Sequence, residues 1–412
     1  MKNLLYIFVL ISVLSGCSVA NSLRMIYANK DIKPTMPASG AEQYEASMQA
    51  FYIGEKPYIK VKADDQEELL FLIDTGASFT MLFDTQTTTR LTLERGFSLE
   101  LRGWGDEENS PAYQTELKSL AFGNVTFENV KVGFIPISTS RYYLRPDEAI
   151  FDGVLGHDLL RHFNWKFDKQ NEQITLTTKS FSTQPSDVEV PIEKFFAKLT
   201  IPVTLHIDGK QFNQEVYVDT GSRHYFKFNT AFVENNDITL PTAAVQASDF
   251  GLSGEAKHTR VRLPGLSIGD MTLKGVKSNV IYAEDEDDFS VVGSALMNQF
   301  VTIIDYQNDV MVFRPYPNVS FNSNYNLAGL DLRKLQNDLL LVRHVFPELV
   351  ADSSGFTAGD VVTSINGVSA KNITEEDWLE MAAKPATFNF CFESKPCTSI
   401  TTHHIKGYST EQ

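Results

Sequence analysis

Two aspartates stand out because each begins the same tripeptide at the end of an apolar run. Asp74-Thr75-Gly76 follows Phe71-Leu72-Ile73, and Asp219-Thr220-Gly221 follows Val216-Tyr217-Val218. A single tripeptide of this kind is most often a turn closed by the aspartate side chain. Two of them in matched surroundings could instead bring two carboxyl groups together. Such a pair can supply both an acid and a base to one reaction.

The surroundings of the two tripeptides match over a long stretch. Each is preceded, 17 residues earlier, by a proline, Pro57 or Pro202. The alternating run and polar turn in between are typical of a hairpin that leads into a buried strand. Downstream, each copy has two apolar residues and a glycine, and then a phenylalanine and an aspartate at equal distances: Val154-Leu155-Gly156, Phe163 and Asp168 in the first copy, and Val291-Val292-Gly293, Phe300 and Asp305 in the second. Residues about 50–180 and 190–315 are therefore interpreted as two copies of one β-rich unit.

This pattern resembles the pepsin and retropepsin superfamily of aspartic proteases, in which each of two lobes gives one aspartate. The Asp-Thr-Gly-Ala form of the first copy is retropepsin-like. The resemblance implies a mostly β protein with two pseudo-symmetric retropepsin-like β-barrel lobes, over residues 49–182 and 183–317. It also implies an aspartic endopeptidase that hydrolyses polypeptide substrates without a cofactor or a metal.

By this resemblance Asp74 and Asp219 are the catalytic pair. Two carboxylates within hydrogen-bond distance cannot both ionise readily, so they share one proton. A glycine after each Asp-Thr lets the loop turn tightly, and the resemblance implies that each threonine hydroxyl bonds to the opposite loop. The supporting loop residues are Thr75, Gly76, Thr220, Gly221 and Ser222.

Two departures from the family pattern bear on activity. Ala77 stands where the second copy has Ser222, so only Asp219 could accept a bond from that hydroxyl, and we predict an optimum less acidic than that of pepsin-like enzymes. Arg223 and His224 follow the second tripeptide, and a cation so close could hold Asp219 ionised. A second hypothesis is therefore a catalytically inactive envelope protein that binds peptides as an adaptor.

Substrate clefts in this family are covered by a β-hairpin flap. The best match is Gly103-Trp104-Gly105, with Trp104 as its apolar tip. Gly251-Leu252-Ser253-Gly254 is the counterpart in the second copy. The alternative for the first segment is a surface turn with a half-buried tryptophan.

Residues 325–408 resemble a PDZ domain, which implies a β fold with one or two helices. The matching segments are Ala358-Gly359-Asp360-Val361-Val362, Ser364-Ile365-Asn366-Gly367 and a helix start at Thr374. The family binds an extended peptide or a free C-terminus as an added strand, so the resemblance implies a module for substrate recruitment or regulation. The carboxylate loop would be Leu327, Ala328, Gly329 and Leu330, although its sequence departs from the usual form. The alternative is a purely structural module.

The three cysteines suggest two roles. Residues 1–16 resemble a lipoprotein signal peptide, with Cys17 as the lipidation site and residues 17–48 as a tether. This predicts a protein anchored in the bacterial cell envelope at the outer membrane, on its periplasmic side, with the lipid as its sole membrane contact. Cys391 and Cys397 flank a short hairpin, where they could form a disulfide or remain as two buried thiols.

Composition excludes other classes of function. The 412 residues include 36 Lys and Arg against 52 Asp and Glu, a formal charge of −16, which argues against binding to nucleic acid. Three cysteines are too few for a four-cysteine zinc site. His157 and His162 are five residues apart and would not share a helix face as a zinc-binding pair does.

Overall fold

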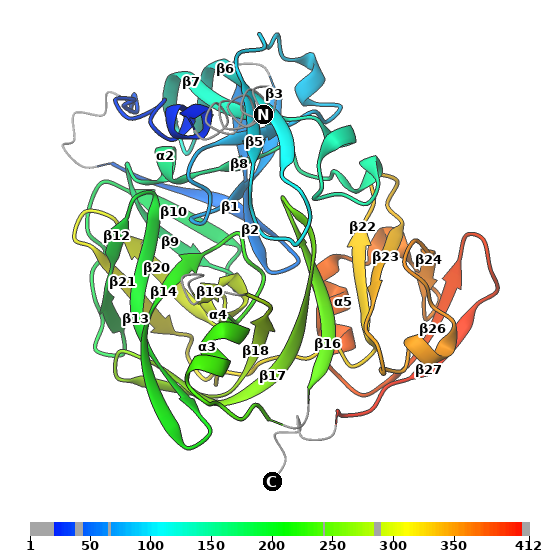
Figure 1. Ribbon diagram of the computed structural model, residues 1–412. Coiled ribbons are helices and arrows are strands. Elements are labelled where there is room, and N and C mark those ends of the chain that lie inside the picture. The colour runs from blue at the N-terminus through cyan, green and yellow to red at the C-terminus, as the bar shows by residue number, and fades with distance from the viewer. Residues whose placement is uncertain (1–19, 38–43, 65–66, 242–243, 284–289, 406–412) are drawn as a thin grey trace, which may run out of the picture.

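The computed structural model describes residues 20–37, 44–64, 67–241, 244–283 and 290–405. Figure 1 shows two β-barrel lobes, one formed by the blue-to-cyan part of the chain and one by the green-to-yellow part, with a smaller C-terminal unit beside them. The predicted mostly β fold with two pseudo-symmetric lobes is confirmed.

The first barrel contains both motifs of the first copy. Its strands, in spatial order, are β2 (Lys56–Ala63), β3 (Glu67–Ile73), β8 (Gly153–Leu155), β4 (Met81–Phe83), β7 (Val125–Ile135) and β6 (Ser110–Phe122). A pairing between β2 and β6 closes the barrel. β5 (Ser98–Leu101) adds an edge strand to β6, and α2 (His157–Leu160) follows β8.

The second barrel repeats this arrangement. Its strands are β13 (Lys198–Ile207), β14 (Lys210–Asp219), β19 (Val291–Gly293), β15 (Phe226–Asn229), β18 (Met271–Ile281) and β17 (Gly254–Ile268). A pairing between β13 and β17 closes it, and β16 (Val245–Gly251) and β12 (Glu193–Phe195) lie at its edges. Two helices belong to this lobe: α3 (Thr230–Asn235) and α4 (Ser294–Met297). Alternate residues of β17, such as Val261 and Leu263, are fully buried because one face of the strand lines the barrel core.

The two copies meet in a six-stranded sheet. Its strands are β11 (Val188–Pro191), β21 (Val310–Pro315), β20 (Phe300–Asp305), β9 (Asn164–Asp168), β10 (Gln173–Thr177) and β1 (Glu45–Ile53). β9 from the first copy pairs antiparallel with β20 from the second. Of the matched positions of the repeat, Asp168, Phe300 and Asp305 thus belong to strands that join the lobes, and Phe163 directly precedes β9.

Part of the predicted tether is ordered against the first lobe. Residues 20–26 are helical, Met25 is fully buried, and Thr35 bridges to Thr126. β1 begins at Glu45, inside the predicted tether, because it pairs with β10 over its first five residues. The predicted signal peptide and Cys17 lie outside the described residues. No helix within the described ranges combines the length and the apolar character needed to cross a membrane.

The C-terminal unit is a six-stranded sheet with one helix against it. Its strands are β22 (Leu330–Lys334), β23 (Leu340–Val345), β24 (Val361–Ile365), β25 (Val368–Ser369), β26 (Thr387–Phe392) and β27 (Thr398–Thr401). α5 (Glu375–Ala382) begins directly after Thr374, the N-cap that the sequence predicts, whose hydroxyl accepts a hydrogen bond from the backbone N–H of Asp377. Trp378 of α5 is buried and donates its indole N–H to the carbonyl of Leu330. Cys391 and Cys397 form a disulfide. Short 3₁₀ turns complete the described elements of the chain: η1 (Thr88–Arg90), η2 (Ile137–Thr139), η3 (Pro146–Glu148), η4 (Asp352–Ser354) and η5 (Ala370–Asn372).

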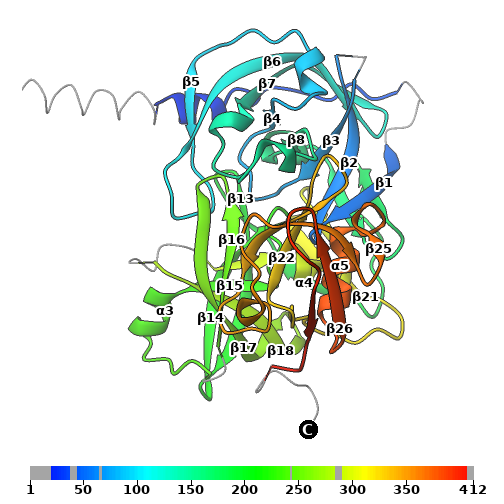
Figure 2. The same cartoon turned by 90° about the vertical axis from the view of Figure 1, so that its right-hand side faces the viewer.

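This unit packs directly on the lobes. Figure 2 shows β22 and α5 in front of the strands β1 and β2. The carboxylate of Glu376 accepts hydrogen bonds from the backbone N–H groups of Gly54 and Glu55, at 3.0 and 2.7 Å, in the turn between β1 and β2. The Gly54 backbone approaches Arg333 and Glu375 so closely that a β-carbon there would lie 2.8 Å from the guanidinium. The C-terminal unit is therefore held against the first lobe by specific contacts.

Candidate active site

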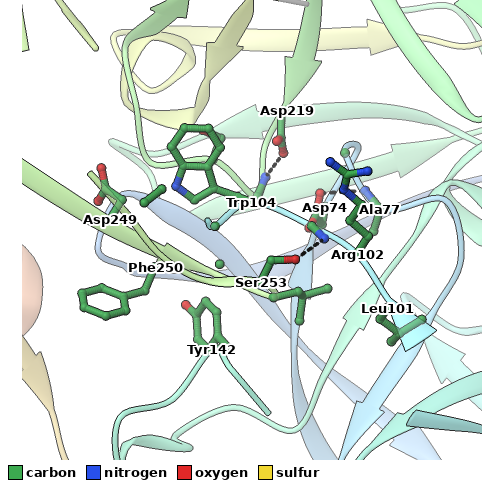
Figure 3. Close-up of a pocket in the computed structure, with 18 of the residues that line it drawn as sticks. Asp74, Ala77, Leu101, Arg102, Trp104, Tyr142, Asp219, Asp249, Phe250 and Ser253 are labelled. Carbon is green, nitrogen blue, oxygen red and sulfur yellow. Dashed lines mark hydrogen bonds between the residues drawn. The ribbon is translucent and has the colours of Figure 1, made fainter. Parts of the chain in front are cut away.

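Equivalent strand pairs position the two aspartates. Asp74 directly follows β3, and Asp219 is the last residue of β14. β3 runs parallel to β8, with Ile73 opposite Leu155, and β14 runs parallel to β19, with Asp219 opposite Gly293. β8 and β19 are the short strands that contain the apolar residues of the second motif in each copy. Both Asp-Thr-Gly loops therefore leave their barrels at equivalent places, and both aspartates line one pocket (Figure 3).

The two glycines allow this approach because each faces the aspartate of the other copy. A β-carbon on Gly76 would lie 2.6 Å from the carboxyl carbon of Asp219, and one on Gly221 would lie 2.4 Å from that of Asp74. Any larger residue would push the carboxyl groups aside. The loops need glycine here for close contact, and neither glycine has a positive φ.

The threonines lock the loops together by reciprocal hydrogen bonds. The hydroxyl of Thr75 donates to the carbonyl of Val218 at 2.8 Å, and that of Thr220 donates to the carbonyl of Ile73 at 2.7 Å. Each hydroxyl also accepts the other threonine's backbone N–H, at 3.0 and 3.1 Å. Both side chains are buried, so these bonds hold the aspartates in fixed positions without competition from water.

The two carboxyl groups lie next to each other, because each is packed against the glycine of the other loop. Burial and the neighbouring Asp219 together raise the pKa of Asp74 to about 7. Backbone amides hold one oxygen of each carboxyl group, with Ala77 N–H donating to Asp74 and Gly221 N–H to Asp219, both at 2.9 Å. Two carboxyl groups so close cannot both ionise readily, so the pair can hold one proton and one negative charge near neutral pH.

A lysine beside the pair was not found from the sequence. Lys198, the first residue of β13, donates from its ammonium group to the carbonyl of Gly76. Its charge lowers the pKa of Asp74 and so opposes the effects of burial and of Asp219. No motif marks this lysine, because its distance from the aspartates depends on how the barrels meet.

The difference between Ala77 and Ser222 has a smaller effect than the sequence suggested. The hydrogen bonds of Ser222 run through its backbone: its N–H donates to the Asp219 carbonyl, and its carbonyl accepts from Ser294. The expected hydroxyl bond to the Asp219 carboxylate is thus not what distinguishes the two aspartates.

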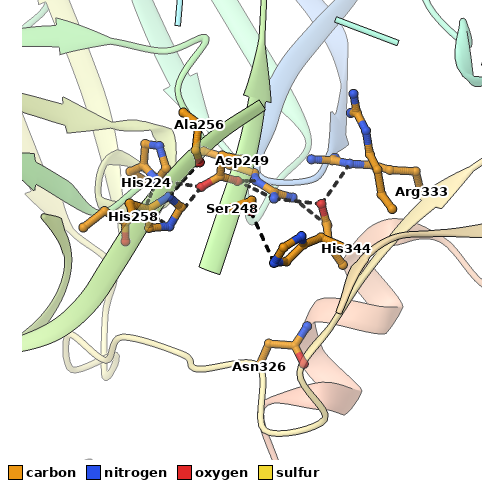
Figure 4. A network of polar contacts seen from close by, with 12 residues as sticks. His224, Ser248, Asp249, Ala256, His258, Asn326, Arg333 and His344 are labelled. Carbon is orange, nitrogen blue, oxygen red and sulfur yellow. Dashed lines mark hydrogen bonds and ion pairs between the residues drawn. The ribbon is translucent and has the colours of Figure 1, made fainter. Parts of the chain in front are cut away.

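Arg223 lines the same pocket, but its charge is bound by two carboxylates other than those of Asp74 and Asp219. Its guanidinium donates two hydrogen bonds to Asp331 of β22, both at 3.0 Å, and a third to Asp249 of β16 at 2.5 Å. Figure 4 shows Asp249 between the imidazoles of His224 and His258 and the arginine side chains. Burial alone would raise the pKa of Asp249, but Arg223 and the two histidines hold it well below its usual range. The prediction that this cation acts on Asp219 is therefore wrong, because two buried carboxylates bind it.

The two predicted flap segments meet above the pocket. Ser253 N–H donates to the Trp104 carbonyl at 2.9 Å, and Glu107 N–H donates to the Ser253 carbonyl at 2.8 Å. A β-carbon on Gly105 would lie 2.1 Å from the Ser253 carbonyl oxygen. The Trp104 ring lies beneath this junction with the Lys227 ammonium 3.9 Å from its centre. Both hairpins therefore form one roof across the pocket.

The pocket beneath this roof has a volume of about 1220 Å³. Its lining contains both aspartates, the two hairpin tips and side chains from all three units of the chain. Lobe 1 contributes Lys56 and Tyr142, the N-terminal helical segment contributes Ser22 and Ile26, and the C-terminal unit contributes Arg333. A cavity of this size accommodates several residues of an extended peptide.

In the predicted carboxylate loop of the C-terminal unit, backbone amides are already hydrogen-bonded to other groups of the chain. The Asn326 side chain accepts from the backbone N–H of Gly329 at 3.0 Å, and the N–H of Leu327 donates to the Ala382 carbonyl. Leu327, Ala328 and Leu330 are buried. These four residues do not line the pocket of the aspartates, and three of their backbone amides are already bonded, since the Leu330 N–H also donates to Asn326 at 3.5 Å. No group of three or more His, Cys, Asp or Glu side chains in the described ranges is arranged to hold a metal ion.

Comparison with known proteins points to the same part of the chain. Residues 59–159 match the family model described as aspartyl protease. This match spans the Asp74 loop, the first flap and the second motif of the first copy. A search of curated proteins finds no match.

Proposed function

We propose that the chain is an aspartic endopeptidase that hydrolyses peptide bonds in polypeptides. The observation that carries this proposal is the close approach of the Asp74 and Asp219 carboxyl groups, each packed against the glycine of the other loop, under a closed roof in a pocket large enough for a peptide. The aspartyl-protease match over residues 59–159 supports the reaction class.

The charge of the pair sets the roles in the reaction. The raised pKa of Asp74 keeps the shared proton on that side, so Asp219 is the base and Asp74 the acid. Asp219 removes a proton from a water molecule as its oxygen attacks the scissile carbonyl carbon, and Asp74 gives its proton to the carbonyl oxygen. When the tetrahedral intermediate collapses, the C–N bond breaks, Asp219 gives its proton to the leaving nitrogen, and Asp74 takes back a proton from one hydroxyl of the intermediate, which restores the pair to its starting state.

The roof requires a conformational step. Three backbone hydrogen bonds join the hairpins, two around Ser253 and one from Asp106 N–H to Glu255 at 2.9 Å. A peptide enters when these bonds open, and closure over it excludes water other than the attacking one.

The rival adaptor function loses its main support. It rested on Arg223 acting on Asp219, and Arg223 is held by Asp249 and Asp331 instead. For the C-terminal unit, we propose a regulatory role rather than capture of a free C-terminus by the loop of residues 327–330, whose backbone is bonded internally.

Unfolded casein provides the test. The wild type is expected to cut it near neutral pH, and Asp219→Asn is expected to lose about 10²–10⁴-fold in rate because the base is removed. The control, Asp270→Asn, changes an exposed aspartate in the turn between β17 and β18 of the same lobe. Casein that stays intact with wild-type protein, or equal cleavage by the Asp219→Asn variant, contradicts the proposal.

Anchoring at the envelope remains a proposal from the sequence. Labelling cells with a palmitate analogue is expected to mark the wild type and to leave Cys17→Ala unmarked. Label on the alanine variant would place the lipid elsewhere.

A further inference from the structure

On one wall of the pocket, the positively charged side chains outnumber the carboxylates that pair with them. Lys56 of β2, Tyr142 of the loop after β7 and Arg333 of β22 line the pocket together. The first two belong to lobe 1, and the third comes from the C-terminal unit. The Lys56 ammonium lies 3.4 Å from the Tyr142 hydroxyl and 5.4 Å from the centre of its ring.

Lys56 is the unbalanced charge. Only 8% of this residue is exposed, and within the described part of the chain no carboxylate forms an ion pair with its ammonium. A buried cation without a counter-ion is costly, so such sites normally hold an anion. The nearest candidate is the catalytic pair, on which Lys56 acts electrostatically. That pair carries one negative charge when it shares one proton. Lys198 also acts on this pair, so one negative charge has to balance the positive charges of two lysines.

The neighbouring arginines already have carboxylate partners. Arg333 donates to Glu375 at 2.7 Å, and Arg343 lies 3.1 Å from Glu148. The buried Arg333 Nε lies 3.8 Å from the carboxylate of Asp331, with which it forms an ion pair. Burial would raise the pKa of Tyr142, but Lys56 and the two arginines outweigh it and lower that pKa. The phenol therefore lies in a strongly positive environment.

We propose that Lys56, Tyr142 and Arg333 form a carboxylate-binding subsite within the substrate cleft. A substrate carboxylate accepts hydrogen bonds there from the Lys56 ammonium and the Tyr142 hydroxyl, and the Arg333 guanidinium lines the same wall as a further positive charge. The inference rests on the proposed endopeptidase function and names its substrate class: peptides with a carboxylate beside the scissile bond. It also gives the C-terminal unit a direct part in substrate recognition through Arg333.

The carboxylate has two sources in a peptide, an acidic side chain or a free C-terminus. The probes are mixtures of capped octapeptides. In each mixture one position is fixed as Glu or as Gln and all others are randomised, and the set of mixtures places the fixed residue at each position in turn. A second set carries a free C-terminus or a C-terminal amide. A preference for Glu at one position assigns a side chain, whereas a preference for the free C-terminus assigns the main-chain carboxylate.

Binding is measured in the Asp219→Asn background by fluorescence anisotropy, so that the readout does not depend on turnover. We expect one of the carboxylate probes to bind at least about 10-fold more tightly than its neutral partner. Lys56→Met should abolish this ratio while leaving binding of the neutral probe unchanged, and Lys56→Arg should restore part of it. The control Lys60→Met changes an exposed lysine of the same strand that pairs with Glu68 at the surface, and it should keep the full ratio.

Every outcome of the binding measurement either supports or contradicts the carboxylate-binding subsite. Equal binding of carboxylate and neutral probes by the parent protein overturns the subsite, as does a ratio that persists in Lys56→Met. The thermal melting of both lysine variants shows that they are folded. The binding ratio and casein cleavage are separate measurements: cleavage without a carboxylate preference defeats the subsite alone, and a Lys56-dependent preference without cleavage defeats the endopeptidase alone.

Discussion

At the scale of single residues, the site depends on how charges around Asp74 are balanced. Burial and Asp219 favour its protonated form, and Lys198 and Lys56 favour its ionised form. The balance places the pKa of Asp74 at about 7, so the pair keeps its proton at pH values where an isolated aspartate has lost it. The predicted less acidic optimum thus has a physical basis in burial and in the paired carboxylates.

Replacing Lys198 tests this balance. The Lys198 charge stabilises ionised Asp74, so in Lys198→Met the proton is harder to remove, and the alkaline limb of the pH–rate profile should move to higher pH. The measurement is kcat/KM for a fluorogenic peptide between pH 4 and 9. Lys274→Met, at an exposed position of β18, should leave the limb in place. A shift of the Lys198→Met profile to lower pH would contradict the assigned sign.

At the scale of the elements, local patterns predicted the strands and the loops but not their partners. Each Asp-Thr-Gly follows a strand, and both flap segments are hairpin tips, because apolar alternation and glycine spacing are local signals. The pairing of the flaps with each other, and the positions of Lys198 and Arg333, depend on contacts between distant segments. Arg223 is the clearest case. Its neighbours in sequence suggested Asp219, whereas the packing of β16 and β22 brings Asp249 and Asp331 to it.

Asp331→Asn tests whether the C-terminal unit supports the catalytic loop. Arg223 follows Gly221 by two residues and binds Asp331 across the interface. Loss of one charge from this buried pair should lower the free energy of unfolding by about 3 kcal/mol and reduce casein cleavage. Asp338→Asn, on the surface of the same unit, where the aspartate lies 4.0 Å from Lys371, should change stability by less than about 0.5 kcal/mol. Unchanged stability and cleavage in Asp331→Asn would show that the unit does not support the loop.

At the scale of the whole molecule, buried histidines set the response of stability to pH. Burial lowers the pKa of His157 and of His162 to about 4, and that of His258 to about 3. In the unfolded chain each titrates near 6.5, so below that pH the unfolded state binds protons that the folded state rejects. Asp74 acts in the opposite direction, because its raised pKa adds stability that is lost as the pH rises from about 4 to 7.

We expect the histidines to dominate and the protein to lose stability in acid. The pKa is lowered in five of the described histidines and raised in five carboxyl groups: His157, His162, His224, His258 and His344, and Asp74, Glu148, Asp158, Glu215 and Glu376. The melting temperature should fall as the pH is lowered from 7 to 4. His157→Gln should make this fall shallower, because the half-buried His157 has a buried, unbonded Nδ1 and the glutamine takes up no proton. A melting temperature that is constant or rises towards pH 4 would contradict the prediction.

The central claim is that Asp74 and Asp219 act as one unit. Its most direct test is the cleavage rate of one fluorogenic peptide by Asp74→Asn, Asp219→Asn and the double variant. Groups that share one proton fail together, so all three variants should lose about 10²–10⁴-fold in rate, and the double variant should be no slower than either single variant. A single variant that retains the wild-type rate, or losses that multiply in the double variant, would show that the two aspartates do not form a catalytic pair.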